Sequence, residues 1–192
     1  IYQGQELGIK NFRRTRIEEF DDISSIDNYY RSLAEGFSSA ESLEFVNQRS
    51  RDNSRTPFQW SDTLNAGFNQ GTAPWLAFSS EEFSVNAETQ LQQKNSVFNF
   101  YKRMIALRNK EFPECLVYGS FLPLENCAES IIAYVRSHAG ESIISITNLS
   151  EQAIPFSMPP GEVLLNNYDS VGSSLKPYQT ILIKEFIKNE KI

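Results

Sequence analysis

The chain has 192 residues, enough for one or two domains with a buried core, and its hydrophobic share of 40% and charged share of 22% are those of an ordinary globular protein. Its formal net charge of -6 at pH 7 argues against a nucleic-acid partner, which requires a basic surface. No apolar run reaches the roughly 18 residues that a membrane-spanning helix needs, so no membrane partner is expected.

The first part of the chain is predicted to contain a strand end and a long loop. Residues 1–5 are apolar enough for the end of a buried strand, and Gly4 and Gly8 permit a tight exit from it. Residues 9–25 are polar and acidic with scattered aromatic residues, which is typical of a loop.

Two helices are expected next. The first spans residues 26–34 and stops at Gly36. Ser38 and Glu41 have the spacing of a capping box, which predicts a second helix that runs to about Gln48.

The segment of residues 51–60, called here the arginine segment, combines two arginines, an acid, small polar residues and an aromatic end. It reads Arg51-Asp52-Asn53-Ser54-Arg55-Thr56-Pro57-Phe58-Gln59-Trp60. Arginine presents a rigid fork of donors and keeps its charge, so Arg51 and Arg55 suit a site that grips hydroxyl or carboxylate oxygens. The alternative is an exposed loop with a surface ion pair.

Prolines interrupt regular structure between residues 50 and 90, at Pro57 and Pro74. An amphipathic helix is then predicted over residues 95–109, because apolar residues recur on one face of it. They are Val97, Phe98, Tyr101, Met104 and Ile105. We expect this helix to serve packing rather than chemistry.

Beyond Pro113 the pattern changes to short apolar and β-branched runs separated by turn residues, which predicts an antiparallel sandwich. The predicted strands are 116–122, 130–136, 142–147, 153–158, 163–165 and 180–186. The domain boundary is accordingly placed between residues 112 and 113.

No cofactor or metal site is predicted. Cys115 and Cys127 lack metal-site spacing and are expected to be reduced core thiols, with a disulfide between them as the alternative. His138, the one histidine, lies in a turn-like stretch without neighbouring ligand residues, so no catalytic or zinc role is expected for it.

Four stretches of the chain resemble, in the expected order, the oligo-1,6-glucosidase and α-glucosidase branch of the α-amylase family of glycoside hydrolases. They are Tyr2-Gln3-Gly4-Gln5-Glu6-Leu7-Gly8, the arginine segment, Asn65-Ala66-Gly67-Phe68, and the stretch from Asn86-Ala87-Glu88 to Arg108. The resemblance is specific up to about Arg108 and continues more loosely to Tyr178.

This resemblance implies an α+β fragment as the fold class. Residues 1–112 would be the last strand and helices of a (β/α)8 barrel with a long substrate-side loop, and residues 113–192 an all-β antiparallel sandwich. The family's three catalytic carboxylates lie upstream of the Tyr-Gln-Gly block, so this chain is expected to hold no catalytic residue and to be inactive alone. The expected whole is a cytoplasmic retaining α-glucosidase, with the remainder of the barrel and an α-linked oligosaccharide as partners.

The resemblance also implies roles for single residues. Both arginines are candidate substrate-binding residues: Arg51 would contact the 4-hydroxyl of the non-reducing glucose, whereas Arg55 would form a salt bridge that shapes the loop. Asp52 would be the partner of Arg55 or of the backbone, and Glu6 would order the loop after the strand.

Several alternatives stay open. Isomaltose-cleaving relatives tend to carry a glutamate where this chain has Ser24, so maltose-like, sucrose-like and phosphorylated substrates, as in trehalose-6-phosphate hydrolase, remain candidates. A transporter subunit without catalysis is a second class. A third is a carbohydrate-binding or structural β-domain over residues 113–192, with aromatic residues at Tyr118, Phe121, Tyr134, Phe156, Tyr168 and Tyr178.

Overall fold

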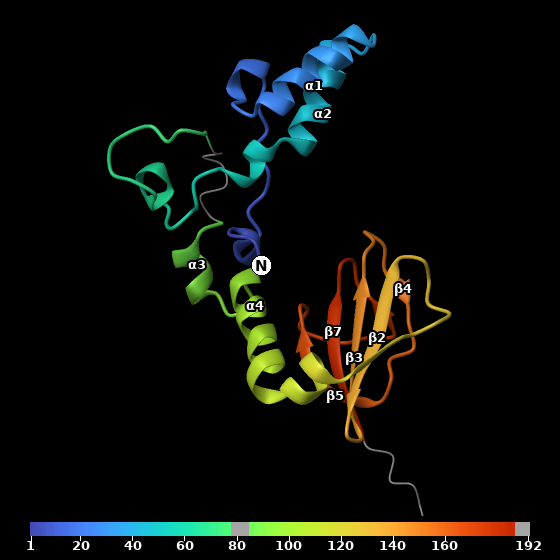
Figure 1. Cartoon of the computed structure of the whole chain (residues 1–192). Helices are drawn as coiled ribbons and strands as arrows, with labels where there is room; N and C mark the ends of the chain where they lie inside the picture. Colours follow the sequence, from blue (N-terminus) through green and yellow to red (C-terminus); the bar gives the residue numbers. More distant parts are fainter. Residues whose placement is uncertain (78–84, 187–192) are drawn as a thin grey trace, which may run out of the picture. The chain divides into compact units, whose positions relative to one another are not determined.

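The computed structural model describes residues 1–77 and 85–186. The chain divides into two compact units, Ile1–Asn99 (the first unit) and Phe100–Ile192 (the second unit), and each is described by itself (Figure 1). Part of the predicted substrate-side loop, residues 78–84, and the end of the predicted sandwich, residues 187–192, lie outside the described residues. The domain boundary between residues 112 and 113 stays a prediction.

The first unit begins with a turn and not with the predicted strand. Residues Gln5–Leu7 form a 3-10 turn (η1), flanked by Gly4 and Gly8 with φ of 97° and 69°, a backbone region that favours glycine. The strand predicted for residues 1–5 is therefore wrong in this structure. A strand needs a hydrogen-bonded neighbour, and the described part of the first unit contains no other strand to provide one.

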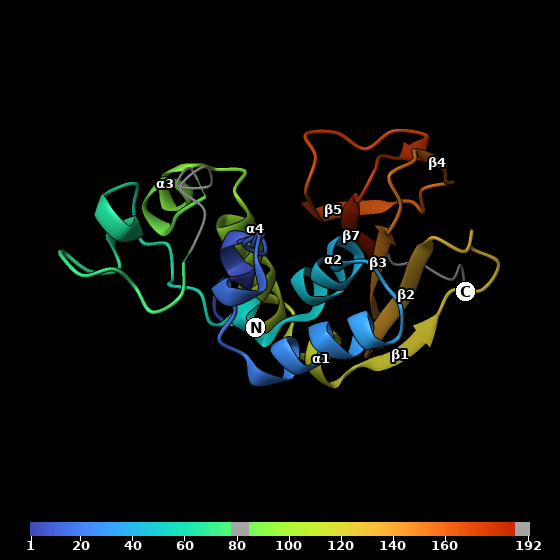
Figure 2. The ribbon, with the colours of Figure 1, turned by 90° about the horizontal axis from the view of Figure 1, so that it is seen from above.

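Two helices, α1 (Ile23–Ala34) and α2 (Ser39–Arg49), lie side by side (Figure 2). Ser38 caps α2: its hydroxyl accepts a hydrogen bond from the N–H of Glu41, and the Glu41 carboxylate accepts one from the N–H of Ser38. The predicted capping box is thus confirmed. Gly36, with φ of 96°, turns the chain between the helices.

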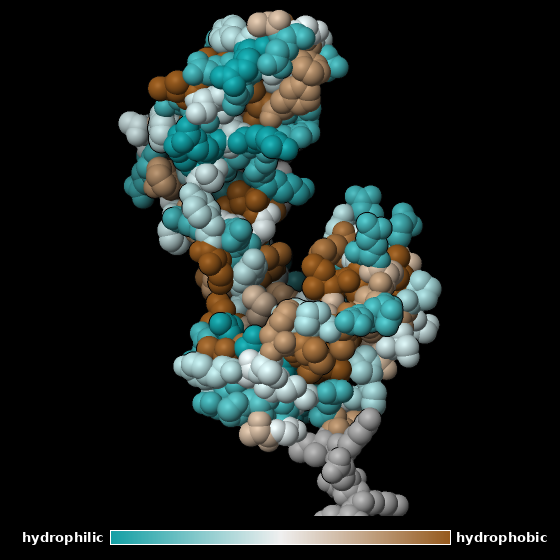
Figure 3. All heavy atoms as spheres, turned by 45° about the vertical axis from the view of Figure 1, so that its right-hand side comes forward, coloured by the Kyte–Doolittle hydropathy of each residue, from teal (hydrophilic) through white to brown (hydrophobic). Residues whose placement is uncertain are grey.

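The core beneath these helices is small. Ile17 and Phe20 from the preceding loop pack with Val46 of α2, and Ile17 belongs to a second 3-10 turn, Ile17–Glu19 (η2). Partly buried residues of the helices surround them, namely Ile26, Tyr29 and Leu43. Hydrophilic residues predominate, with scattered apolar ones, on the face of this region that Figure 3 shows. The cluster has only three buried apolar residues, so apolar burial here is limited.

The rest of the first unit consists of short elements joined by polar contacts. They are η3 (Arg51–Ser54), η4 (Leu64–Gly67), α3 (Ala87–Gln92) and the start of α4 (Val97–Ala106). Gln90, buried in α3, connects α3 to η1 and to the start of α4. Its side-chain amide donates to the carbonyl of Leu7, and its side-chain oxygen accepts from the N–H of Phe98 at 3.0 Å.

The predicted amphipathic helix over residues 95–109 is confirmed as α4, although it ends at Ala106. Two π-helical segments follow, Leu107–Glu111 (η6) and Glu114–Tyr118 (η7). The second replaces the start of the strand predicted from residue 116. Arg136 explains this difference, because its guanidinium donates to the carbonyl of Cys115 at 3.4 Å and to that of Val117 at 2.9 Å, satisfying main-chain acceptors that a strand would have paired.

The second unit is built on a five-stranded antiparallel sheet. Its strands are β1 (Ser120–Pro123), β2 (Ile131–His138), β3 (Glu141–Asn148), β5 (Gly161–Asn166) and β7 (Thr180–Glu185). The order across the sheet is β1-β2-β3-β7-β5. Two further short strands, β4 (Ile154–Pro155) and β6 (Ser174–Leu175), form a separate pair.

Each face of the sheet carries its own apolar cluster, because successive side chains of a strand point to opposite faces. On β7, Ile181 and Ile183 join one cluster with Ile146 and Leu175, whereas Leu182 joins the other. That second cluster contains Leu107 and Cys115 from the π-helical segments. Loop residues around β4 cover the first cluster, among them Phe156 and Met158.

The antiparallel organisation predicted for this region is therefore confirmed, and the sandwich stays a prediction. The strand predicted over residues 153–158 is reduced to Ile154–Pro155, where Pro155 lacks the N–H that a longer ladder needs. Cys115 and Cys127 are both free, as expected. Burial, followed by the charge of Glu141, raises the pKa of the Cys115 thiol.

Candidate functional site

The arginine segment begins directly after α2 and folds as a tight turn, η3. Ser50 caps this turn, since its hydroxyl accepts a hydrogen bond from the N–H of Asp52 at 3.2 Å. The Ser54 hydroxyl donates back to the carbonyl of Arg51 at 2.9 Å. The turn separates the two predicted arginines, so that each borders a different pocket of the first unit.

Asp52 is the fixed centre of this turn. Its side chain is fully buried, and its Oδ2 accepts hydrogen bonds from the N–H of Asp21 at 2.8 Å and of Asp22 at 3.0 Å. Its Oδ1 lies 3.6 Å from Nη1 of Arg55. The prediction that Asp52 serves Arg55 or the backbone is thus confirmed for both partners.

Arg51 borders the smaller of these two pockets, called here the Arg51 pocket, with a volume of about 370 Å³ between α1, α2 and η3. Its Nη2 lies 2.8 Å from Oδ1 of Asp22 and donates to the hydroxyl of Ser24 at 3.0 Å. The Arg51 side chain is 61% exposed, whereas that of Asp22 is 4% exposed. The exposed guanidinium is therefore anchored on a buried carboxylate at the start of α1.

Asp22 stays ionised in this environment. Burial favours its protonated form, but the hydrogen bonds from Ser25, at 2.7 Å, and from Arg51 outweigh burial. The pKa of Asp22 consequently lies below its ordinary value. A carboxylate that is ionised at neutral pH thus faces Arg51.

Arg55 borders the second pocket, called here the Arg55 pocket, with a volume of about 520 Å³. The pocket joins two regions far apart in the sequence, the Tyr-Gln-Gly-Gln stretch at the N-terminus and the arginine segment. The hydroxyl of Tyr2 donates to the carbonyl of Ser54 at 3.1 Å and ties them together. The structure therefore brings together two of the motifs that the sequence singled out.

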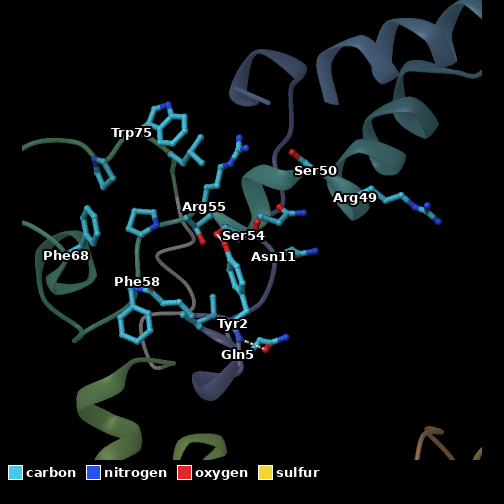
Figure 4. A pocket seen from close by; sticks show the side chains of 18 of the residues that line it. Tyr2, Gln5, Asn11, Arg49, Ser50, Ser54, Arg55, Phe58, Phe68 and Trp75 are labelled. Atoms are coloured by element: carbon cyan, nitrogen blue, oxygen red, sulfur yellow. Dashed lines mark hydrogen bonds between the residues drawn. The ribbon is translucent and has the colours of Figure 1, made fainter. Parts of the chain in front are cut away.

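Figure 4 shows how the side chains of the Arg55 pocket lie. Arg55 and Trp75 lie at the same end of the pocket in this view, and Tyr2 lies beside Ser54. Phe58 and Phe68 supply apolar surface, while Asn11 and Gln48 add amide groups. A cationic fork, amides and aromatic rings in one hollow can bind a polyhydroxylated ring, whose hydroxyls take hydrogen bonds and whose C–H faces contact aromatic carbon.

Sequence reasoning missed two residues near this site. The indole N–H of Trp75 donates to Oδ2 of Asp21 at 3.1 Å. A tryptophan directly after Pro74 in a polar, loop-like stretch was a usable sequence signal. Arg14 is almost fully buried, with its guanidinium 4.8 Å from the ring centre of Phe20 and 3.3 Å from Oδ1 of Asn53. No local signal marked Arg14, because with Arg13 and Arg16 beside it the sequence has the composition of an exposed charged loop.

The other predicted residues take modest roles. The carboxylate of Glu6 accepts a hydrogen bond from the N–H of Gly4 at 2.8 Å, which orders the first turn as predicted. His138 ends β2 with a half-exposed side chain, 3.9 Å from Glu114. Across the described ranges, no three His, Cys, Asp or Glu side chains are grouped so that they could hold a metal ion.

Within the described residues, no helix has both the length and the apolar character required to cross a bilayer. The predicted cytoplasmic location stays a prediction.

Residues 1–119 match the family model described as "Alpha amylase, catalytic domain". The chain is 37% identical over 176 residues to the oligo-1,6-glucosidase of Parageobacillus thermoglucosidasius, an alignment that covers 88% of this chain and 31% of the relative. The chain thus spans about a third of the length of the curated relatives that it matches.

Solved structures of two related enzymes are also similar to this chain. The trehalose-6-phosphate hydrolase of Bacillus licheniformis superposes with a TM-score of 0.87 at 33% identity, covering 96% of this chain and 35% of that one. The isomaltulose synthase of Klebsiella sp. LX3 superposes with a TM-score of 0.85 at 35% identity, covering 96% and 34%.

Proposed function

Because this chain belongs to the α-amylase family of glycoside hydrolases, we propose that it forms the C-terminal part of a retaining α-glucosidase that hydrolyses terminal α-glucosidic bonds of oligosaccharides. Such enzymes use a pair of carboxyl groups on either side of the scissile bond. We propose that these carboxyl groups belong to the remainder of the barrel and that this chain contributes sugar-binding residues.

The observation that carries the proposal is the Arg55 pocket. A guanidinium beside a buried carboxylate, next to amides and aromatic rings, is suited to select one arrangement of sugar hydroxyls. A site built to donate hydrogen bonds to a hydroxyl also rejects an analogue that lacks it, since the donor is then left without a partner.

The geometry favours an exchange of the roles predicted for the two arginines. Arg51 is already engaged by Asp22 and Ser24, which fits a brace at the start of α1. Among the described residues, Arg55 makes one ion pair, at the longer distance of 3.6 Å, and it lines the pocket that the Tyr-Gln-Gly stretch also lines. We therefore propose Arg55 as the sugar ligand and Arg51 as the residue that shapes the rim.

A phosphorylated disaccharide is the second candidate substrate. Arg31, Arg49 and Arg51 all line the Arg51 pocket, and only Arg51 has an ion-pair partner within the described residues. Guanidinium groups are well suited to phosphate. A trehalose-6-phosphate hydrolase among the similar solved structures agrees with this candidate.

The test is an assay of the enzyme that contains this chain, on a chromogenic α-glucoside, isomaltose, sucrose and trehalose 6-phosphate. We expect hydrolysis by the enzyme and none by the 192-residue chain alone. Activity of the chain alone would place the catalytic carboxylates within it, whereas an enzyme inactive on all four substrates would favour a transporter subunit or a binding module.

Variants of that enzyme test the roles of the arginines. Arg55→Ala should lower kcat/KM by about 2–4 kcal/mol of transition-state binding, because a charged donor to the sugar is lost. Arg51→Ala should cost less on an uncharged substrate. A larger loss of kcat/KM for Arg51→Ala than for Arg55→Ala would instead support Arg51 as the residue that contacts the glucose hydroxyl.

A further inference from the structure

Asp52 is a buried carboxylate whose two oxygens have different environments. Oδ2 accepts two main-chain hydrogen bonds, from Asp21 and Asp22. Oδ1 accepts no hydrogen bond from the described residues, and its near neighbour is Nη1 of Arg55 at 3.6 Å. Ionised carboxylates are costly to bury without compensation, so the position of Arg55 is coupled to this oxygen.

The same carboxylate connects the arginine segment to the start of α1. Asp21 and Asp22 are about thirty residues away in sequence, and their N–H groups point at Oδ2. The side chain of Asp22 in turn anchors Arg51. Asp52 therefore lies between the two arginine contacts, with a direct link to Arg55 and a main-chain link to the anchor of Arg51.

The side chain of Arg55 needs such a constraint. It is 39% exposed, and a long side chain with that much freedom loses conformational entropy when it binds a ligand. A fixed negative charge at one end of the guanidinium limits its orientations before the sugar arrives. Preorganisation of this kind strengthens binding without any additional contact to the ligand.

We propose that Asp52 is a positioning residue for sugar binding: it orients Arg55 in the Arg55 pocket through Oδ1, while Oδ2 independently holds the start of α1. This proposal rests on the proposed function of Arg55 as the sugar ligand. The two oxygens give it a testable signature, because a substitution can remove the charge and keep the hydrogen-bond acceptor.

Asp52→Asn is that substitution. Its single side-chain oxygen can still accept from the N–H groups of Asp21 and Asp22, whereas its amide presents N–H donors towards Arg55. Asp52→Ala removes both links. Glu18→Gln is the matched control, since Glu18 is an exposed acid in η2, the turn that precedes α1.

The experiment is a double-mutant cycle in the enzyme that contains this chain, with kcat and KM measured on a chromogenic α-glucoside. Asp52→Asn should lower kcat/KM by about 10- to 100-fold in the wild-type background and by less than about twofold in the Arg55→Ala background, because the residue acts through Arg55. Glu18→Gln should leave both values unchanged. Equal losses in the two backgrounds would overturn the proposal and leave Asp52 a structural residue.

A second measurement separates this proposal from the proposed function. Side-chain NMR of Arg55 should show a restrained guanidinium in the wild type and a mobile one in Asp52→Asn, while the amides of Asp21 and Asp22 remain protected from exchange. An enzyme inactive on every α-glucoside, with this NMR difference intact, would refute the function and keep the positioning. An Arg55 signal that Asp52→Asn does not change would refute the positioning itself.

Discussion

The two units of this chain are stabilised by different kinds of contact. Most buried apolar side chains in the described residues belong to the second unit, where they fill both faces of one sheet. Most buried polar side chains belong to the first unit, among them Arg14, Asp22, Asn47, Asp52 and Gln90. The unit that carries the candidate site therefore contains more buried side-chain hydrogen bonds, many of them to main-chain groups.

This difference has an energetic meaning. Apolar burial is non-directional and tolerates small shifts, whereas a buried hydrogen bond requires defined geometry and leaves a costly orphan when one partner is removed. A site that must present Arg55 in one orientation benefits from the second kind of contact. The tryptophans, Trp60 and Trp75, both lie in the first unit, so their fluorescence follows that unit selectively.

The largest expected effect concerns apolar burial in the second unit. Ile146 is fully buried on β3, the middle strand of the sheet, so Ile146→Ala should destabilise the second unit by about 2–5 kcal/mol through lost burial and a residual cavity. Amide exchange of β3 and β7 measures this loss, and tryptophan fluorescence during urea unfolding should stay unchanged. Ile132→Ala is the control, because Ile132 is exposed on the neighbouring strand; an equal loss there would contradict the account.

The next effect concerns the buried hydrogen bonds of the first unit. Asn47 is buried and makes reciprocal hydrogen bonds with the main chain of Arg14, at 2.8 and 2.9 Å. Asn47→Ala should cost the first unit about 1–3 kcal/mol, because the N–H and carbonyl of Arg14 lose their partners. Urea unfolding followed by tryptophan fluorescence checks this value. Gln48→Ala, at the exposed neighbouring position, should change the free energy of unfolding little. Similar losses for both variants would show that the buried hydrogen bonds of Asn47 contribute no special stability.

A smaller effect is expected at the helix cap. Ser38→Ala should destabilise α2 by about 1 kcal/mol, since the N–H of Glu41 loses its acceptor. Ser38→Thr keeps a hydroxyl at this position and should retain most of the stability. Thermal unfolding monitored by tryptophan fluorescence compares the two variants. Identical midpoints would show that the Ser38 hydroxyl does not contribute to the stability of the first unit.

The smallest effects concern pH and should separate the units. The pKa of Asp22 is lowered, so its contribution to the first unit is present above the unfolded pKa of about 3.9 and is lost as pH falls through the lower folded value. The pKa of Lys184 is raised, mainly by its hydrogen bond to Glu141, so its contribution to the second unit is lost only as pH rises through that raised value.

Unfolding across pH measures both contributions. Asp22→Asn should flatten the acid limb of the first unit alone, and Lys184→Gln should flatten the alkaline limb of the second. If Asp22→Asn leaves the acid dependence of the free energy of unfolding unchanged, other carboxylates cause that dependence.

The second unit was the more predictable because short apolar and β-branched runs between turn residues indicate strands that are buried on both faces. On β7, for example, three consecutive apolar residues, Ile181 to Ile183, are all buried. The π-helical segment before β1 was not predictable, since it depends on Arg136, about twenty residues away. The short pair β4 and β6 likewise depends on tertiary packing and not on a periodic pattern.

In the first unit, local signals worked where the physics is local. The box of Ser38 and Glu41 predicted the start of α2, and the partners of Asp52 were correctly inferred. The strand at residues 1–5 failed because pairing is not encoded within the strand itself. The separation of Arg51 and Arg55 into two pockets was also missed, because it follows from the 3-10 turn between them.

The order of the sheet has a consequence for how the protein is made. The strand β7, last in sequence among the described strands, lies between β3 and β5 and joins the edge strand β5 to the rest of the sheet. While a ribosome still holds residues 180–185, β2 and β3 can form only a partial sheet with an open edge that is prone to wrong pairing. Nascent chains stalled before Thr180 should therefore be cleaved readily by protease within the second unit, and chains released beyond Glu185 should resist.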